Sequence, residues 1–277
     1  MAEVPGILGR IVERTLEDVR LRRDPGKRRE IEASAARRAS RRKDLAKALR
    51  REPDTDPVRF ICEVKKASPS KGLLAPDLDP AALAEVYREA GASAISVVTE
   101  PHFFQGEDAF LSRARSKAGG LPLLRKDFHV DEWQILEAAA GEADALLFLA
   151  SVLSAVQLKD YLDVADAFQL GHLVEVSSRR EAETALKAGA RVIGINNRDL
   201  TTFEVDPTRT EAVLPVLREA DRVSVAESGI HNRETVERFE KAGVHALLVG
   251  EALMTAGDPG DKLRELRGVE AGPGSSP

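Results

Sequence analysis

The 277-residue sequence lacks the features of secreted and membrane proteins. Its single cysteine, Cys62, can form no disulfide within the chain, which fits a reducing compartment. The longest apolar stretch, residues 145–156, is interrupted by two serines and is too short to span a bilayer as a helix. The first thirty residues are charged throughout and contain no apolar region of a signal peptide. We therefore expect a cytoplasmic protein that binds no membrane.

The sequence also lacks the usual signatures of metal and covalent catalysis. None of the five histidines is spaced from another as paired zinc ligands are, so we expect no metal site. No Ser-His-Asp arrangement is recognisable, and we expect Cys62 to face outward, beneath helices, as part of the core. Nucleophilic acyl chemistry is therefore not expected.

Positive charge is concentrated near the N-terminus. In residues 10–51, Lys and Arg outnumber Asp and Glu by more than two to one, although the net charge of the whole chain is −5. Such a segment can attract nucleic acid or phosphate. Apolar residues nevertheless recur in and around it at roughly helical spacing: Ile7, Leu8, Ile11, Val12, Leu16 and Val19, and later Leu45 and Leu49. Because the segment has no aromatic side chain to stack on bases, we expect helices with solvated faces and no nucleic-acid partner.

From residue 58 onward, short apolar runs alternate with charged, helical segments. The eight runs are 58–65, 94–99, 122–126, 145–150, 172–176, 191–196, 222–226 and 246–250. Each run is too apolar for a half-exposed antiparallel sheet, which favours parallel strands buried on both faces. Eight strand–helix units match an α/β fold of the (β/α)8 TIM barrel type. An open doubly wound sheet is the alternative, but it rarely uses eight such regular units, and no Gly-x-Gly-x-x-Gly follows the first run.

The segments between the runs have the composition of helices, and several end in glycine. We expect helices at 80–90, 131–140, 154–168, 178–188, 208–220 and 232–242. Gly91, Gly141, Gly189 and Gly243 follow four of them, at positions where a left-handed cap favours glycine. We expect three regions: a helical N-terminal extension over residues 1–57, the catalytic barrel over 58–267, and a disordered tail over 268–277.

The first apolar run carries charges where a buried strand should have none. Glu63 and Lys65 are two residues apart, so both side chains point to the same face as Ile61, while Cys62 points to the other. Charges at the end of a buried strand cost too much free energy to be kept for packing alone. The loop that follows, Ser-Pro-Ser-Lys-Gly from Ser68, offers hydroxyls, a cation and a permissive backbone for an anionic substrate. We therefore expect a functional site here rather than a structural ion pair.

The other expected strands also end in polar residues, and the carboxyl ends of all strands in a TIM barrel meet at one mouth. These residues are Thr99, Glu100, Lys126, Asp127, Glu175, Asn196, Asn197, Arg198, Glu227, Ser228 and Glu251; the fourth strand adds only apolar residues near Leu147. Asn196 and Arg198 would point together only if the strand continued past Asn197. Gly229 and Gly250 let backbone N–H groups approach a phosphate. The pattern predicts acid–base chemistry on a phosphorylated small molecule.

Together these residues resemble the motifs of indole-3-glycerol phosphate synthases over about residues 58–265. The motifs are Glu63-x-Lys65-x-x-Ser68-Pro69-Ser70-Lys71-Gly72, Thr99-Glu100 leading to Phe103-Phe104-x-Gly106, Arg125-Lys126-Asp127-Phe128, Val174-Glu175-Val176, Gly194-Ile195-Asn196-Asn197-Arg198-Asp199-Leu200, Ala226-Glu227-Ser228-Gly229-Ile230 and Val249-Gly250-Glu251. Glu107, His129 and Trp133 depart from the family pattern. These departures put the expected loop packing and substrate affinity in doubt, but every catalytic position of the family is kept. For His129 and Trp133 we favour ordinary packing over a place in the mouth.

The resemblance implies closure of the indole ring of anthranilate linked to a deoxyribulose phosphate, with release of carbon dioxide and then water and without metal or cofactor. It assigns protonation of the ketose oxygen to Lys126, the hold on the aromatic carboxylate to Lys65, and later proton removal to Glu175. Glu63 would orient the lysines and keep them charged. The remaining implied roles are hydrogen bonds to the intermediate from Asn196 and Arg198, and contacts on the ribulose side from Glu227 and Ser228.

The resemblance also implies how the two ends of the substrate are bound. Phosphate would bind Ser68, Gly229, Gly250 and the backbone of Glu251. The aromatic ring would enter an apolar slot between Phe104, Phe128 and Leu147. The helical extension of the family helps to cover the site, which would explain residues 1–57.

Two other functions stay open on the residues alone. Phosphoribosylanthranilate isomerase, another phosphate-handling barrel, uses a cysteine at the end of its first strand, where this chain has Glu63 and Lys65. A non-catalytic barrel that binds RNA through the basic segment would show strong, salt-sensitive binding, but degraded strand ends would be expected of it and these are intact. For the assembly we expect a monomer or weak oligomer.

Overall fold

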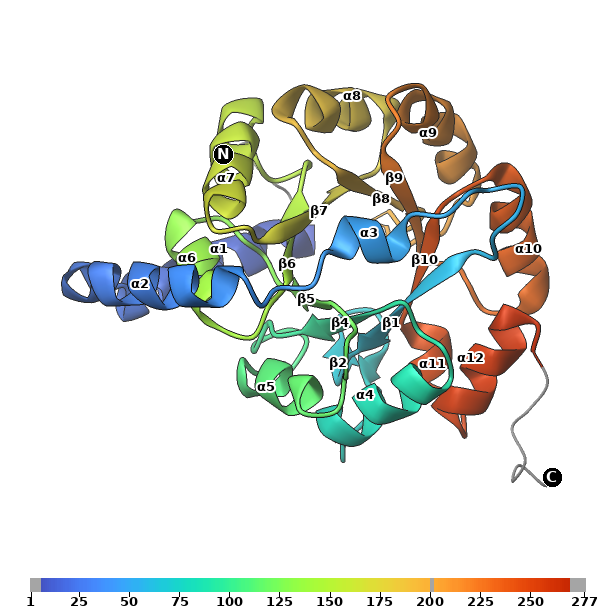
Figure 1. The fold of residues 1–277 in the computed structure, drawn as a ribbon, viewed down its shortest axis with the longest axis horizontal. Coiled ribbons are helices and arrows are strands. Elements are labelled where there is room, and N and C mark those ends of the chain that lie inside the picture. Colours follow the sequence, from blue (N-terminus) through green and yellow to red (C-terminus); the bar gives the residue numbers. More distant parts are fainter. Residues whose placement is uncertain (1–5, 200–201, 270–277) are drawn as a thin grey trace.

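The computed structural model describes residues 6–199 and 202–269 and contains a closed barrel of parallel strands (Figure 1). The strands, in chain order, are β1 (Arg59–Val64), β4 (Ala94–Val98), β5 (Leu123–Lys126), β6 (Ala145–Leu149), β7 (Gly171–Val176), β8 (Val192–Asn196), β9 (Val223–Glu227) and β10 (Ala246–Val249). Neighbours in the chain are neighbours in the barrel, and β1 closes it against β10. The predicted TIM barrel is confirmed, and each strand begins and ends within one residue of the expected bounds.

Helices surround the strands and connect them (Figure 1). They are α4 (Pro80–Glu89), α5 (Ala109–Arg115), α6 (Glu132–Ala140), α7 (Ala155–Ala167), α8 (Arg179–Ala188), α9 (Thr208–Glu219), α10 (Arg233–Ala242), α11 (Glu251–Met254) and α12 (Pro259–Arg267). The six expected helices are present. The sequence did not predict α5, α11 and α12, because short polar segments carry little helical periodicity. A small hairpin, β2 (Ala67–Ser68) with β3 (Gly72–Leu73), forms the loop after β1.

Three of the four glycines after helices have the expected left-handed conformation. The φ angles of Gly91, Gly189 and Gly243 are +91°, +99° and +85°, a region where a side chain would be strained. The prediction for Gly141 is wrong, because its φ of −86° and ψ of −159° are extended. α6 ends with the Gly141 N–H donating to the Glu137 carbonyl (2.9 Å), and the chain leaves without a left-handed turn.

Alternate residues of each strand pack on opposite faces. Ile61, Leu124 and Leu147 belong to one large buried cluster, whereas Cys62 packs in a second cluster, which includes Tyr87 of α4. Cys62 is fully buried, so its predicted place in the core is confirmed, and burial raises the pKa of its thiol. Burying a large aliphatic side chain contributes about 1.5–3 kcal/mol, so this alternation stabilises the closed sheet on both faces.

The residues before β1 form helices α1 (Gly6–Arg22), α2 (Arg28–Ala39) and α3 (Leu45–Leu49), with a 3-10 turn at Pro25–Lys27. α2 lies beside α6, and α3 crosses the barrel in Figure 1, where Leu45 and Leu49 join the interior cluster. The helical spacing read from the sequence is confirmed, since Leu8, Ile11, Val12 and Val19 are buried on one face of α1.

The basic segment faces acidic and carbonyl groups of the barrel. Three arginines pair with carboxylates on or next to α6: Arg22 with Glu137 (3.0 Å), Arg28 with Glu132 (2.5 Å) and Arg38 with Glu142 (2.7 Å). Further along, Arg50 pairs with Asp221 (2.7 Å), and Arg51 donates to the Val244 carbonyl (2.8 Å). The excess of positive charge in the N-terminal helices is therefore complementary to acidic groups on the surface of the barrel that they cover.

At the C-terminus, α12 ends at Gly268 with a left-handed φ of +70°. Residues 270–277 of the predicted disordered tail lie outside the described residues. No helix within residues 6–199 and 202–269 is long and apolar enough to cross a membrane.

Candidate active site

One cavity opens at the carboxyl ends of the strands. Among the residues that line it are all fifteen named as site residues from the sequence: Glu63, Lys65, Ser68, Phe104, Lys126, Phe128, Leu147, Glu175, Asn196, Arg198, Glu227, Ser228, Gly229, Gly250 and Glu251. β1 and β5–β9 end in these side chains because every second residue of a strand points inward. The structure therefore brings the candidates together, and their chemical roles are proposals.

Glu63 binds both lysines of the cavity. Its Oε1 lies 2.6 Å from the Lys65 Nζ, and its Oε2 lies 3.6 Å from the Lys126 Nζ. Burial favours the neutral acid, but the two ammonium groups outweigh it and hold the pKa of Glu63 below its ordinary value. Burial likewise disfavours a charged Lys126, yet Glu63, Glu175 and Glu227 raise the pKa of Lys126. The raised pKa of Lys126 therefore favours its protonated form, which has a proton to donate.

A chain of hydrogen bonds joins the ends of β7, β8 and β9. The Asn196 Nδ2 donates to the Glu175 Oε1 (2.8 Å), and the Ser228 hydroxyl donates to the Asn196 Oδ1 (2.9 Å). The amide of Asn196 is thus oriented from both sides, since its nitrogen can only donate and its oxygen only accept. These hydrogen bonds fix the Oε1 of Glu175, and its Oε2 takes no part in them.

Glu227 is a buried carboxyl group with an unusual environment. Burial raises the pKa of Glu227 well above its ordinary value, and the charges of Glu175 and Glu63 add to this effect against the opposing Lys126. Within the described residues its Oε1 has no hydrogen-bond partner. That oxygen occupies space left by Gly194, where a Cβ would lie only 2.0 Å away. Burial and the neighbouring carboxylates thus favour the protonated form of Glu227.

An apolar slot lies beside the charged groups. The rings of Phe104 and Phe128 are 6.1 Å apart and tilted by 41°, and Leu147 lines the same cavity. Three side chains of α1 also line the cavity: Ile7, Leu8 and Ile11. The sequence indicated their helical spacing but not their place in the site, because amphipathicity does not say what a helix packs against.

The phosphate end of the expected site contains one feature that the sequence did not predict. Ser228 and Gly229 have positive φ angles of +66° and +78°, and α11 begins just after Gly250. The Glu251 carboxylate, however, binds two cations on two different loops: Lys71 (3.1 Å) and Arg198 (3.2 Å). Burial opposes ionisation, but these two cations lower the pKa of Glu251.

Arg198 and Asn196 both line the cavity, although β8 ends at Asn196. The expected condition, a strand continuing past Asn197, is not met. Instead, Arg198 forms an isolated bridge with Val205 and donates to the Phe203 carbonyl (3.2 Å). Asn197 turns away into the core, where its Oδ1 accepts from the Thr210 hydroxyl (2.8 Å).

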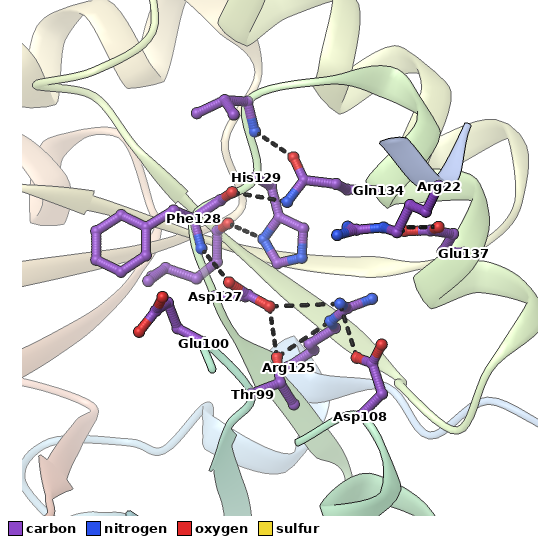
Figure 2. A network of polar contacts seen from close by, with 12 residues as sticks. Arg22, Thr99, Glu100, Asp108, Arg125, Asp127, Phe128, His129, Gln134 and Glu137 are labelled. Carbon is purple, nitrogen blue, oxygen red and sulfur yellow. Dashed lines mark hydrogen bonds and ion pairs between the residues drawn. The ribbon is translucent and has the colours of Figure 1, made fainter. Parts of the chain in front are cut away.

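His129 and Trp133 pack in the core and do not line the cavity, as favoured from the sequence. His129 and Phe128 point in opposite directions from the end of β5 (Figure 2). The His129 Nδ1 lies 2.8 Å from the Leu147 carbonyl oxygen, so the ring donates there as the neutral tautomer. Burial and the nearby Arg125 lower the pKa of His129 to about 4.

No group of three or more His, Cys, Asp or Glu side chains that could hold a metal ion is found in residues 6–199 and 202–269. The polar atoms of the cavity are instead engaged with one another, in the lysine–carboxylate contacts and the Glu175–Asn196–Ser228 chain.

Known proteins share this sequence and this fold. The family model of indole-3-glycerol phosphate synthase matches residues 8–266. A relative of that name from Carboxydothermus hydrogenoformans is 47% identical over 222 residues, covering 80% of this chain and 84% of the relative. Another from Campylobacter hominis is 40% identical over 263 residues, covering 95% of this chain and all of the relative. A solved 3-hexulose-6-phosphate synthase, 15% identical with a TM-score of 0.60, covers 77% of this chain and all of its own, and shows the fold alone. The chain belongs to the indole-3-glycerol phosphate synthase family.

Proposed function

We propose that the cavity closes the indole ring of 1-(2-carboxyphenylamino)-1-deoxyribulose 5-phosphate with Lys126 as the general acid. The observation that carries the proposal is the position of the Lys126 ammonium, held by Glu63 beside the Phe104–Phe128 slot. An aromatic ring in the slot would present its carbon to the ketose carbon next to it. Transfer of a proton from Lys126 to the ketose oxygen makes that carbon electrophilic and neutralises the developing charge.

Lys65 holds the aromatic carboxylate until it leaves as carbon dioxide. Its Nζ is fixed 2.6 Å from Glu63, so the cation is directed while its remaining N–H groups can donate to the substrate. Holding the carboxylate in one orientation keeps the breaking bond aligned with the ring system. Glu63 therefore serves both lysines, and its low pKa keeps it ionised in the enclosed site.

Loss of carbon dioxide restores the benzene ring. Glu175 then removes a proton from the new five-membered ring while its hydroxyl, protonated by Lys65, leaves as water, which completes the indole. The Glu175 Oε1 is occupied by the Asn196 amide, which leaves the other oxygen to act as base. We assign Glu227 the role of hydrogen-bond donor to the ribulose side, because burial raises its pKa. The Ser228 hydroxyl, which donates to Asn196, can accept a hydrogen bond there. Two carboxyl groups in different surroundings thus take different roles, Glu175 as base and Glu227 as donor.

The proposal also covers phosphate binding, the oligomeric state and the cellular compartment of the protein. Ser68, Gly229, Gly250 and the backbone of Glu251 would hold the phosphate, and Arg198 would bind the intermediate once it leaves Glu251. We keep the expectations of a monomer or weak oligomer in the cytoplasm, which sedimentation and fractionation would test. Nucleic acid is not a partner in this proposal, because arginines of the basic segment pair with the barrel.

The test is a fluorescence assay for the indole product, without added metal, on the wild type and Lys126→Met. Methionine fills similar space but cannot donate a proton. Turnover should fall by roughly three to four orders of magnitude, within the range that a positioned acid contributes together with its charge. Unchanged circular dichroism would show that the barrel is intact. Near-normal turnover by Lys126→Met would remove the acid assignment.

The rival isomerase function has no support in the arrangement of β1. Cys62, which would have to serve as its catalytic thiol, is fully buried and faces α4 rather than the cavity. A binding-only barrel would not need two lysines and three carboxyl groups directed at one apolar slot.

A further inference from the structure

A buried polar network of Thr99, Arg125 and Asp127 lies at the end of β5, the strand that carries Lys126 (Figure 2). Arg125 precedes Lys126 in β5, so its side chain points to the opposite face of the strand, and Asp127 follows the strand's last residue. These two side chains are only 5% and 7% exposed and lie 3.3 Å apart. Thr99, just after the neighbouring strand β4, is buried with them. Asp127 also lines the cavity, so the charged cluster lies directly beside the proposed acid.

Thr99 makes contact with three consecutive residues around the acid. Its backbone N–H donates to the Lys126 carbonyl (3.1 Å). Its hydroxyl donates to the Asp127 Oδ2 (2.6 Å) and accepts from the Arg125 Nε (3.2 Å). The hydroxyl thus acts at once as donor and acceptor, which fixes its rotation. One side chain at the end of β4 sets the position of the end of β5.

The same network reaches the apolar slot. The other oxygen of Asp127 accepts from the Phe128 N–H (2.8 Å). Glu100, the neighbour of Thr99, accepts from three successive backbone N–H groups, those of His102 (3.0 Å), Phe103 (2.7 Å) and Phe104 (2.9 Å). The ends of β4 and β5 therefore place Phe104 and Phe128 as well as Lys126.

Stability alone is a weak reason to bury such a cluster. The free-energy cost of removing Arg125 and Asp127 from water offsets much of their attraction, and an apolar pair of similar volume could fill the space. An apolar pair could not fix the orientation of its neighbours, whereas hydrogen bonds between defined donors and acceptors can.

We propose that Thr99, Arg125 and Asp127 are positioning residues, which hold the Lys126 ammonium and the ring-binding slot in the relative geometry needed for ring closure. The proposal rests on the role given above to Lys126. It adds that the catalytic geometry depends on a hydroxyl that never touches the substrate.

The test compares Thr99→Val with Thr99→Ser in the full-length protein. Valine has nearly the shape of threonine but no hydroxyl, whereas serine keeps the hydroxyl and loses only a methyl group. We expect Thr99→Val to lower kcat by roughly 10- to 100-fold, the scale of a misplaced catalytic group, with KM changed less than about threefold. Thr99→Ser should retain kcat within about threefold of the wild type, so that the conservative variant rescues the effect.

Two outcomes would overturn the proposal. If Thr99→Val lowered Tm but kept the kcat of the wild type, the network would be structural only. If Thr99→Ser lost as much kcat as Thr99→Val, the methyl group and not the hydroxyl would matter. Asp127→Asn gives the same test should Thr99→Val fail to fold, because it removes the charge that the hydroxyl binds while keeping an acceptor for the Phe128 N–H.

Asp108→Asn is the matched control. Asp108 also pairs with Arg125 (2.8 Å), but its side chain is 73% exposed and approaches from the solvent side. Its removal should leave kcat unchanged, and a loss equal to that of Thr99→Val would contradict the proposal. The acid assignment is judged separately by Lys126→Met: full activity there would refute that assignment, whereas full activity in Thr99→Val would refute only the positioning role.

Discussion

Acid should destabilise the protein through His172, a buried ring that cannot take up a proton without losing a hydrogen bond. His172 is 2% exposed, and its Nε2 accepts from the backbone N–H of Arg191 (3.0 Å). Burial, and then the charge of Arg191, lower the pKa of His172 from its ordinary 6.5 to about 3. Asp166 lies 3.8 Å from the Nδ1 and would favour the proton, but it is half exposed and already pairs with the Arg191 guanidinium.

The size of the effect follows from the two states of the ring. Below pH 6.5 the unfolded chain binds a proton at His172, whereas the folded chain stays neutral there down to about pH 3. Stability is therefore lost as the pH falls below 6.5, at about 1.4 kcal/mol for each pH unit. Between pH 7.5 and pH 5 the loss due to this one residue is about 2 kcal/mol. That is a large share of the roughly 5–15 kcal/mol of a typical folded domain.

The assay is urea unfolding of the wild type and His172→Gln at both pH values, followed by the fluorescence of the single tryptophan, Trp133. Glutamine keeps an acceptor for the Arg191 N–H and does not titrate. The drop in the free energy of unfolding between pH 7.5 and pH 5 should be about 2 kcal/mol smaller in the variant. Comparing the drops in the two proteins cancels the contributions of the other titrating groups. These include His129, whose pKa is lowered, and Glu227, whose raised pKa changes the stability in the opposite direction. An equal drop in both proteins would refute the reasoning.

Two further changes test the contribution of α1 to the cavity wall and the space that Gly194 leaves for the Glu227 side chain. Deletion of residues 1–40 removes the three apolar side chains that α1 contributes, so KM should rise by at least roughly tenfold, or about 1.4 kcal/mol, while circular dichroism still shows a barrel; an unchanged KM would mean that the extension is merely structural. Gly194→Ala should lower kcat by roughly 100-fold, because the new methyl group would lie 2.0 Å from the Glu227 Oε1. Gly120→Ala, where a Cβ meets open space, is the control, and equal activity of the two variants would contradict the assignment.

The barrel and the members of its site could be predicted because both follow from local pattern. Parallel strands buried on both faces read as apolar runs, so a charged residue at the end of a run is conspicuous. Glu63, Lys126, Glu175 and Glu227 stood out in this way, and the alternation of side chains directed them inward. Knowledge of the fold then placed the strand ends at one mouth, since all parallel strands end on the same side.

Contacts between distant segments could not be predicted. Thr99 has an ordinary strand-end sequence context, and its role depends on which strand lies beside it and on the rotation of one hydroxyl. The bridge from Glu251 to Lys71 and Arg198 joins loops far apart in the chain. Gly141 shows the limit of local rules as well: a glycine after a helix permits a left-handed cap but does not require one.

The pairing of the N-terminal extension with the barrel also determines the order in which the chain can fold. Arg38 binds Glu142, Arg50 binds Asp221 and Arg51 binds the Val244 carbonyl, across 104, 171 and 193 positions of sequence. During synthesis these arginines therefore emerge long before their partners exist. Contacts of such range form slowly, because a long loop must close for each of them. The extension can therefore complete its contacts only once the barrel segments as far as Val244 have been made.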